Sequence, residues 1–244
     1  MKKLATRYLL EFIVIVCGIS ISFYIEKSNL NSYNEKLKNI SLKKIYENLS
    51  QDIDDLEYNL MVHQDAAISG QQIINRGSYL FKNQKDSLGY HLSLITSGVT
   101  FFLDNSEEYS GMKNSGLIEL IENQNLVSSL QTRYAETKIF SVIDEIFTSA
   151  YTKLKEYTFK KISNDRKQYP KFYGPLTFGS FIGDKPIDTE TLNYIIEKTG
   201  MHNFYIEVMK IRIEEDKRII KLIADELKID LTQSQKNSWS KMAD

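Results

Sequence analysis

Residues 8–25 read YLLEFIVIVCGISISFYI, and this run decides the architecture that the sequence predicts. Apart from Glu11 and two small hydroxyl side chains the run is apolar, and a short basic segment, residues 1–7, precedes it. A basic end followed by an apolar run is typical of a signal sequence or a signal anchor. As a helix the run extends about 27 Å, slightly less than the roughly 30 Å hydrocarbon core of a bilayer. We therefore expect residues 8–25 to be a transmembrane anchor in contact with lipid.

The residues around the run favour its retention over its removal as a secretory signal. Ser20 and Ser22 resemble a small-x-small cleavage site, but residues 23–25 continue the apolar face and no Gly or Pro follows until position 70. Lipidation of Cys17 needs a small residue before the cysteine, where Val16 stands. Basic residues flank both ends of the run, so the orientation follows from the short tail. We expect residues 1–7 to be cytoplasmic and the bulk of a single-pass inner-membrane protein to be periplasmic.

Three residues within the run are candidates for transmembrane packing. Glu11 lies one helical turn after Arg7, so it forms either an ion pair with that arginine or a contact with a partner helix. Gly18 and Ser22 are four residues apart and form a small-xxx-small face, which suits close approach of a second helix.

The rest of the chain predicts long helices, because all three prolines fall between residues 168 and 186. Apolar spacings of three and four predict a helix over residues 30–74 that ends at Gly77, and a second, antiparallel helix over residues 126–162. The acidic residues 52–57 are interpreted as a solvated face. Shorter or interrupted helices are expected at the remaining positions: 87–96, 106–121, and 188 or 189 to 229 with a pause at Gly200. The predicted fold is all-α, an N-terminal transmembrane helix that continues into an antiparallel bundle of long helices over residues 26–230, with a polar tail at 231–244.

Residues 168–186 read QYPKFYGPLTFGSFIGDKP, a composition that no helix survives. A long loop in a compact domain is either functional or pinned over the core. The sequence leaves open whether this loop is a packing cap or a surface for a ligand or partner. Its five aromatic residues are the candidates for that surface: Tyr169, Phe172, Tyr173, Phe178 and Phe181.

Three segments resemble an uncharacterised family of single-pass envelope proteins from Bacteroidota, known as a domain of unknown function. They are residues 11–25 (EFIVIVCGISISFYI), residues 109–134 (YSGMKNSGLIELIENQNLVSSLQTRY) and the closing helix at residues 193–227. The sequence departs from the family at Tyr24 and Ile25, where a tryptophan often stands, so the aromatic interfacial anchor is only partly kept. The resemblance implies a membrane anchor and a helical outer domain, and it assigns no catalytic residues.

The sequence lacks the patterns of the common reactive sites. The 31 basic and 32 acidic residues nearly cancel, which argues against nucleic acid as a partner. The three histidines have no zinc-hydrolase spacing, the single cysteine allows no thiolate metal site, and no phosphate loop or nucleophile elbow occurs. We therefore name no catalytic residue, cofactor or metal ligand and expect no enzyme.

The sequence favours an interaction or scaffold protein that binds another envelope protein or its own copy. The alternative is a ligand-binding, sensor-like domain that acts through a partner.

Overall fold

The computed structural model describes residues 2–136, 138–149, 151–170 and 176–229, without the side chains at 2–7, 9, 138, 144, 148 and 149. The chain folds into two compact units. Unit 1 comprises Met1–Glu47, Ser106–Ser128 and Leu222–Asp244, and unit 2 comprises Asn48–Asn105 and Ser129–Lys221.

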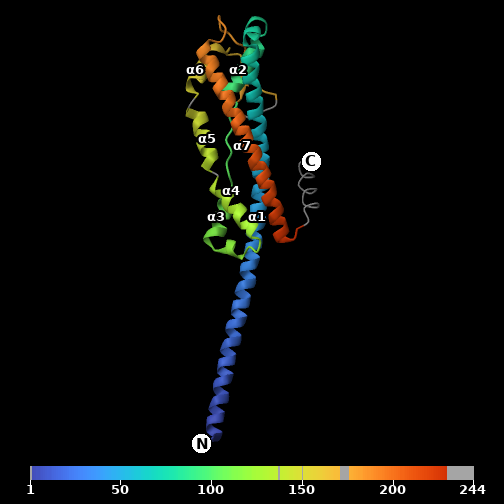
Figure 1. Ribbon diagram of the computed structural model, residues 1–244, viewed down its shortest axis with the longest axis vertical. Coiled ribbons are helices and arrows are strands. Elements are labelled where there is room, and N and C mark those ends of the chain that lie inside the picture. Colours follow the sequence, from blue (N-terminus) through green and yellow to red (C-terminus); the bar gives the residue numbers. More distant parts are fainter. Residues whose placement is uncertain (1, 137, 150, 171–175, 230–244) are drawn as a thin grey trace. The chain divides into compact units, whose positions relative to one another are not determined.

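The described residues are almost entirely helical, as Figure 1 shows, so the prediction of an all-α protein is confirmed. The helices are α1 (Lys2–Asn83), α2 (Lys85–Ser97), α3 (Glu107–Asn114), the 3-10 turn η1 (Leu117–Leu120), α4 (Gln124–Ala135), α5 (Lys138–Ser149), α6 (Thr152–Lys161) and α7 (Thr189–Leu227). Two short strands, β1 (Lys167–Gln168) and β2 (Thr177–Phe178), lie between α6 and α7. Among the helices of the described residues, none combines the length and the apolar character needed to cross a membrane.

The first helix is longer than the sequence predicted. It continues through Gly77 to Asn83, so the predicted boundary at Gly77 is wrong. A glycine inside a helix costs only about 1 kcal/mol relative to alanine. This cost is too small to end a helix whose buried face continues from Ile73 to Leu80.

The predicted second long helix, residues 126–162, is instead three helices, α4, α5 and α6. The prediction was wrong because short helices that bury the same side keep the apolar spacing of one long helix. Phe140, Ile143 and Phe147 of α5 and Leu154 of α6 are all buried in unit 2. Their spacing reports the buried side of each helix and does not show where one helix ends.

Helix α7 begins where the sequence predicted. Asp188 caps its first turn, because its carboxylate accepts hydrogen bonds from the Thr191 backbone N–H at 2.8 Å and from the Thr191 hydroxyl at 3.0 Å. The expected pause at Gly200 is absent, and the helix continues to Leu227.

The core of unit 2 is rich in aromatic residues. Helix α1 contributes Leu56, α5 contributes Phe147 and α7 contributes Tyr205, and the last two rings lie 5.9 Å apart. The segment at residues 99–105, which links α2 to α3, inserts Phe102 5.0 Å from the Phe140 ring. A second cluster joins Leu88 and Leu92 of α2 to residues of α6 and α7.

In unit 1, the ion pair between Lys38 and Glu226 binds the backbone of the turn before α4. Lys38 of α1 lies 3.4 Å from Glu226 of α7 and donates to the Leu120 carbonyl at 3.3 Å. The Glu226 carboxylate also accepts the backbone N–H groups of Glu122 and Asn123 at 3.1 and 3.2 Å. Burial lowers the pKa of Lys38, but hydrogen bonds and charges from Glu35 and Glu226 outweigh it and the net pKa is raised. Lys38 therefore stays charged at neutral pH.

Candidate functional site

The N-terminal part of α1 exposes an apolar surface on every side. All described side chains from Leu10 to Ile25 are exposed, among them Phe12 at 63%, Val14 at 69% and Phe23 at 67%. No other described element of unit 1 lies beside this part of the helix (Figure 1). Single exposed apolar residues are normal, but a contiguous apolar surface of this kind marks an interaction with protein or membrane.

The predicted packing residues lie on this exposed surface. The Ser22 hydroxyl donates to the Gly18 carbonyl at 2.9 Å, so its polar group is satisfied within the helix. A methyl group added at Gly18 would meet nothing within 4 Å. A shallow groove of about 450 Å³ runs past both residues, from Ile15 to Glu26. Glu11 lies on the same helix, and its predicted partner Arg7 is outside the described side chains.

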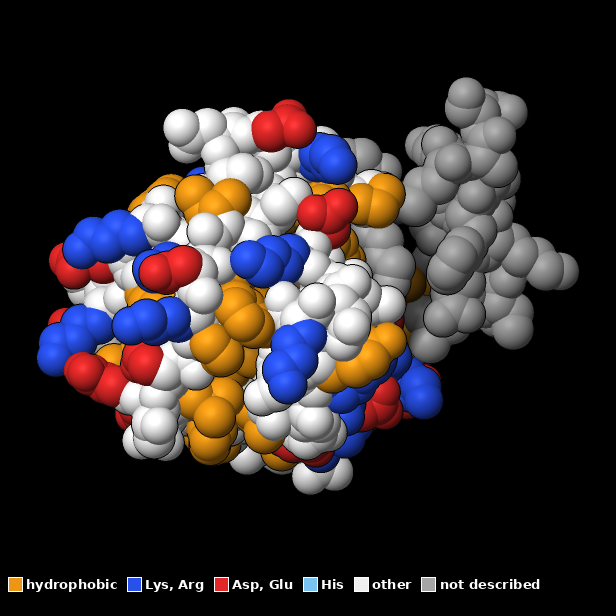
Figure 2. Space-filling view, turned by 90° about the horizontal axis from the view of Figure 1, so that it is seen from above, with side chains coloured by type: hydrophobic (Ala, Val, Ile, Leu, Met, Phe, Trp, Pro, Cys, Tyr) orange, Lys and Arg blue, Asp and Glu red, His pale blue; other side chains and the backbone are white. Residues whose placement is uncertain are grey.

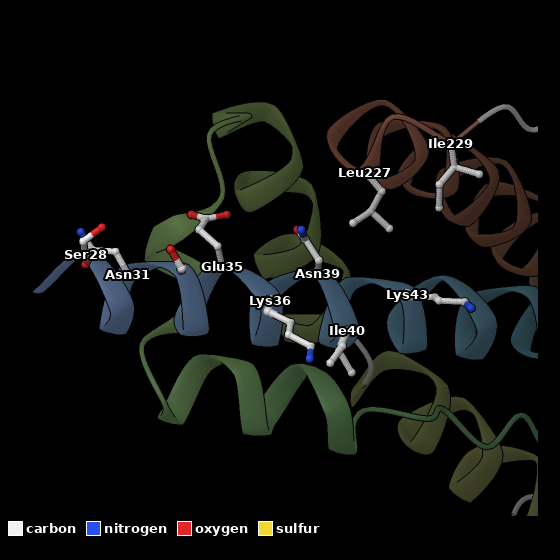
Figure 3. A pocket seen from close by; sticks show the side chains of 10 residues that line it. Ser28, Asn31, Glu35, Lys36, Asn39, Ile40, Lys43, Leu227 and Ile229 are labelled. Atoms are coloured by element: carbon white, nitrogen blue, oxygen red, sulfur yellow. The ribbon is translucent and has the colours of Figure 1, made fainter. Parts of the chain in front are cut away.

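Unit 1 also carries an open groove of about 810 Å³ where α1 and the end of α7 meet (Figure 3). Polar residues of α1, among them Asn31, Glu35 and Lys36, line one side. Leu227 and Ile229 point into it from the other side. Small-molecule sites bury 70–90% of the ligand surface in typical cases. An open groove of this kind is therefore better suited to a flat partner than to a small molecule.

The aromatic loop lies partly in the core. Tyr169 and Phe181 are each 1% exposed, and the Tyr169 hydroxyl donates to the Tyr90 carbonyl at 2.7 Å. Phe178, on β2, is partly buried, and its ring centroid lies 4.9 Å from that of Tyr169 with the two ring planes tilted by 46°. These three residues have the positions of a packing cap. Phe172 and Tyr173 lie outside the described residues.

The sequence did not predict the two strands in this loop. β1 and β2 pair antiparallel, with Lys167 opposite Phe178 and Gln168 opposite Thr177. An isolated bridge joins Ile162 to Phe181. Strands of two residues are too short to leave the alternating pattern by which a strand is recognised.

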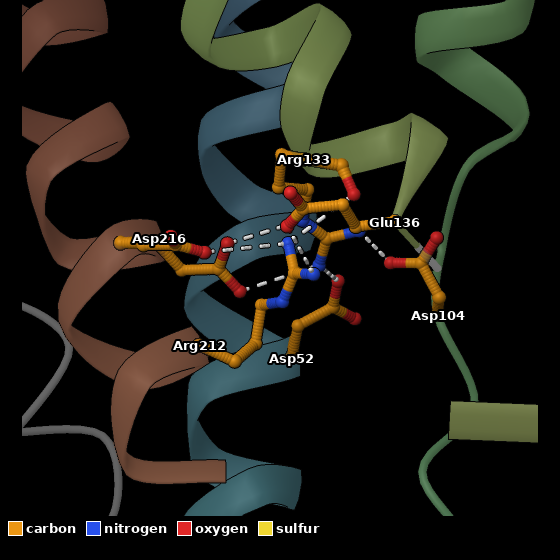
Figure 4. Close-up of polar contacts among 7 residues, drawn as sticks. Asp52, Asp104, Arg133, Glu136, Arg212 and Asp216 are labelled. Atoms are coloured by element: carbon orange, nitrogen blue, oxygen red, sulfur yellow. Dashed lines mark hydrogen bonds and ion pairs between the residues drawn. The ribbon is translucent and has the colours of Figure 1, made fainter. Parts of the chain in front are cut away.

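A buried polar cluster in unit 2 is the feature that sequence reasoning missed. The Arg133 side chain on α4 is 1% exposed and contacts three aspartates (Figure 4). Its Nε and Nη2 donate to the two oxygens of Asp216 at 3.0 and 3.3 Å, and Nη2 also donates to Asp52 at 2.6 Å. Nη1 donates to Asp104. Arg212 donates to the Arg133 carbonyl at 3.2 Å and lies 3.5 Å from Glu136.

The electrostatics of this cluster are unbalanced, because three buried carboxylates face one guanidinium. Burial raises the pKa of Asp52 to about 6, against the charge of Arg133 and with the help of the negative charge on Asp216. Burial also raises the pKa of Asp216, although hydrogen bonds and charge from Arg133 oppose the shift. The described residues contain no group of three His, Cys, Asp or Glu side chains placed to bind a metal ion.

The interpretation of residues 52–57 as a solvated face is wrong for Asp52, which is 4% exposed. On a helical wheel Asp52 falls beside Leu49 and Leu56, on the edge of the apolar stripe. That position is the signal that could have identified it.

Side chains of α1 also bind the backbone of the extended segment at residues 99–105. The Asp52 carboxylate accepts the Asn105 N–H, and Asp55 accepts the Leu103 N–H. His63 lies 3.4 Å from the Thr100 carbonyl. This segment is thus held by side chains in place of a strand partner.

Two histidines that lie far apart in sequence form a buried pair. Nδ1 of His63 lies 3.0 Å from Nδ1 of His202, so one ring donates and the other accepts. Burial lowers the pKa of His63 to about 4, against the backbone of Thr100. Burial, with the charges of His63 and Lys198, lowers the pKa of His202. Both rings are therefore neutral near pH 7, as expected for core residues.

Basic and acidic side chains alternate on the face that Figure 2 shows, with hydrophobic side chains between them. This mixture matches the near-neutral net charge of −1.

The exposed apolar part of α1 and the buried Arg133 cluster are the two features of the described residues that call for a functional explanation. Comparisons with protein-family models, with curated proteins and with solved structures gave no match. The assignment of a function therefore rests on the chain's own residues.

Proposed function

We propose that the chain is a membrane-anchored helical interaction or scaffold protein of the cell envelope. In this proposal residues 8–25 are the anchor in the inner membrane, and residues 26–230 form an antiparallel bundle on the periplasmic side. The observation that supports it most is the exposure of every described side chain from Leu10 to Ile25. The basic residues before the run and the resemblance to single-pass envelope proteins point in the same direction.

The energetics of burial explain why this surface needs a partner. Burying one large aliphatic or aromatic side chain contributes about 1.5–3 kcal/mol. The run carries many such side chains, and when they are exposed to water the chain gains none of this stabilisation. The proposal rests on the exposure of these side chains and not on hydropathy, because no helix of the described residues has the hydropathy of a membrane-crossing segment. Lipid or a second apolar helix would supply the missing contacts.

The geometry of unit 1 favours interaction over small-molecule sensing. The described groove at Asn31 and Leu227 is open and mixes polar and apolar residues. A protein surface can cover such a groove without enclosing a cavity. The partner is another envelope protein or a second copy of the chain.

The anchor is tested by extracting membranes at alkaline pH in carbonate. The wild-type chain should stay in the membrane pellet, whereas Val14→Asp should move to the supernatant, because a charge near mid-bilayer costs about 2.5–3.5 kcal/mol on insertion scales. Tyr33→Asp is the control, since Tyr33 is 59% exposed on the same helix but outside the run. Release of the wild-type chain by carbonate would contradict the anchor.

The interaction role is tested on the full chain extracted in mild detergent. Mass measurement of the detergent complex should show either a second copy or a second protein at fixed stoichiometry. A monomer that co-purifies with no other protein would contradict the interaction role while leaving the anchor intact.

A further inference from the structure

The Arg133 cluster belongs to unit 2, and in the sequence each of its residues lies close to one of the points at which the chain passes from one unit to the other. The chain crosses four times, in α1, in the segment before α3, in α4 and in α7. Each crossing segment contributes one residue to the cluster. Asp52 lies four residues after Asn48, Asp104 one before Asn105, Arg133 four after Ser129 and Asp216 five before Lys221. We refer to Arg133, Asp52, Asp104 and Asp216 as the guanidinium clamp.

The clamp carries more negative than positive charge in its fully ionised form. Arg133 must satisfy three carboxylates, and Asp52 and Asp216 repel one another. Arg212 adds a second positive charge, but it is shared with Glu136 at 3.5 Å and Glu215 at 3.8 Å. A proton on Asp52 removes the cost of burying an ionised carboxylate and the repulsion from Asp216, and these two effects together exceed the attraction to Arg133 that it weakens. The protonated carboxyl group still accepts hydrogen bonds.

We propose that the guanidinium clamp is a proton-operated device, which holds the four crossing segments more tightly when Asp52 carries a proton than when all three aspartates are ionised. The groups that act on Asp52 are Arg133 from α4, Asp216 from α7 and the Asn105 N–H from the extended segment. Around them, Asp104 contacts Arg133, and the charge of Arg212 acts on Asp216. Asp52 is the switching group because it sits between the guanidinium and the backbone of that segment.

The direction of the effect follows from linkage. Burial raises the pKa of Asp52 to about 6, above the value of 3.8 expected when the clamp opens and the carboxyl is solvated. The closed clamp therefore binds the proton more tightly than the open one, so opening becomes easier as pH rises through 6. These two pKa values predict that opening is about fourfold more favourable at pH 7.5 than at pH 5.5. His63, which touches Thr100 of the same segment, has a pKa of about 4 and stays neutral in this range.

The test is amide hydrogen exchange of the full chain in mild detergent at pH 5.5 and 7.5, with rates corrected for intrinsic exchange. The Leu103 and Asn105 amides, which bind Asp55 and Asp52, are the reporters. The Leu42 and Ile45 amides of α1 are the internal reference, because α2 binds Lys198, whose pKa of about 7 lies in the tested range. Wild type should lose about fourfold protection at the higher pH. Asp52→Asn, which mimics the protonated group, should show the same protection at both pH values. Asp54→Asn removes an exposed charge from the same helix and should behave like wild type.

Equal protection of the wild-type reporters at both pH values would overturn the proposal, and so would a fourfold difference that persists in Asp52→Asn. If Asp52→Asn does not fold, the carboxyl carbon shift of Asp52 in wild type decides. A titration midpoint near 6 together with the loss of protection supports the device, and a midpoint near 4 overturns it.

Discussion

At the residue scale, unit 2 buries ionisable groups that the sequence does not mark as unusual. Lys198 on α7 is 1% exposed, and its Nζ donates to the Thr96 carbonyl at 2.5 Å and lies 5.0 Å from the Tyr151 ring centroid. Burial lowers the pKa of Lys198 to about 7, with a further contribution from the charge of Lys155. Carbonyl and ring contacts offset only part of the cost of burying an ammonium group.

The pH dependence of folding should reveal this lysine. Its pKa of about 7 in the folded chain lies below the usual lysine pKa of 10.5, so the unfolded chain holds more protons between these pH values and stability rises with pH. Wild type should gain about 3 kcal/mol from this group between pH 7 and pH 9.5. Lys198→Met should lose that gain, as measured by urea unfolding followed by far-UV circular dichroism. Lys210→Met, at an exposed position on the same helix, should keep the gain in stability. If the stability of Lys198→Met rises with pH as steeply as that of wild type, the buried-lysine account is wrong.

At the element scale, most helices were predictable and their ends were not. The apolar stripe of α1 and the cap at Asp188 follow from residues close in sequence, which is why periodicity and capping rules found them. The breaks between α4, α5 and α6 carry no Gly or Pro to mark them. The aromatic loop was predictable as non-helical, but the burial of Tyr169 and Phe181 depends on α2, which lies some eighty residues away in sequence.

Helix α2 and the segment after β2 approach so closely that only glycine fits between them. A methyl group at Gly89 would collide with the Gly179 carbonyl and the Phe181 backbone, which itself donates to the Lys85 carbonyl at 3.0 Å. We expect Gly89→Ala to lower the free energy of unfolding by about 1–3 kcal/mol. Thermal unfolding measures the loss.

Gly200→Ala is the matched control for this substitution. A methyl group there meets nothing within 4 Å, and alanine is the better helix former. The variant should gain about 0.5–1 kcal/mol. Equal effects of the two substitutions would show that the close approach at Gly89 contributes nothing.

At the scale of the whole molecule, the candidate site divides into a part that sequence reveals and a part that it does not. The exposed run at residues 8–25 is read from consecutive residues. The guanidinium clamp joins residues whose relation exists only after folding, and only Asp52 carried a local signal. His63 and His202, 139 residues apart, are hidden for the same reason.

The long reach of the clamp has a consequence for the order of folding. Its three contacts span 29, 81 and 83 residues, so each one requires the closure of a long loop. The helices can form locally within microseconds. The Arg133 guanidinium, in contrast, can contact all three carboxylates only after all four segments have come together in the folded chain. The cluster is thus a late event in assembly, and weakening it should speed the escape from the native state more than it slows the approach.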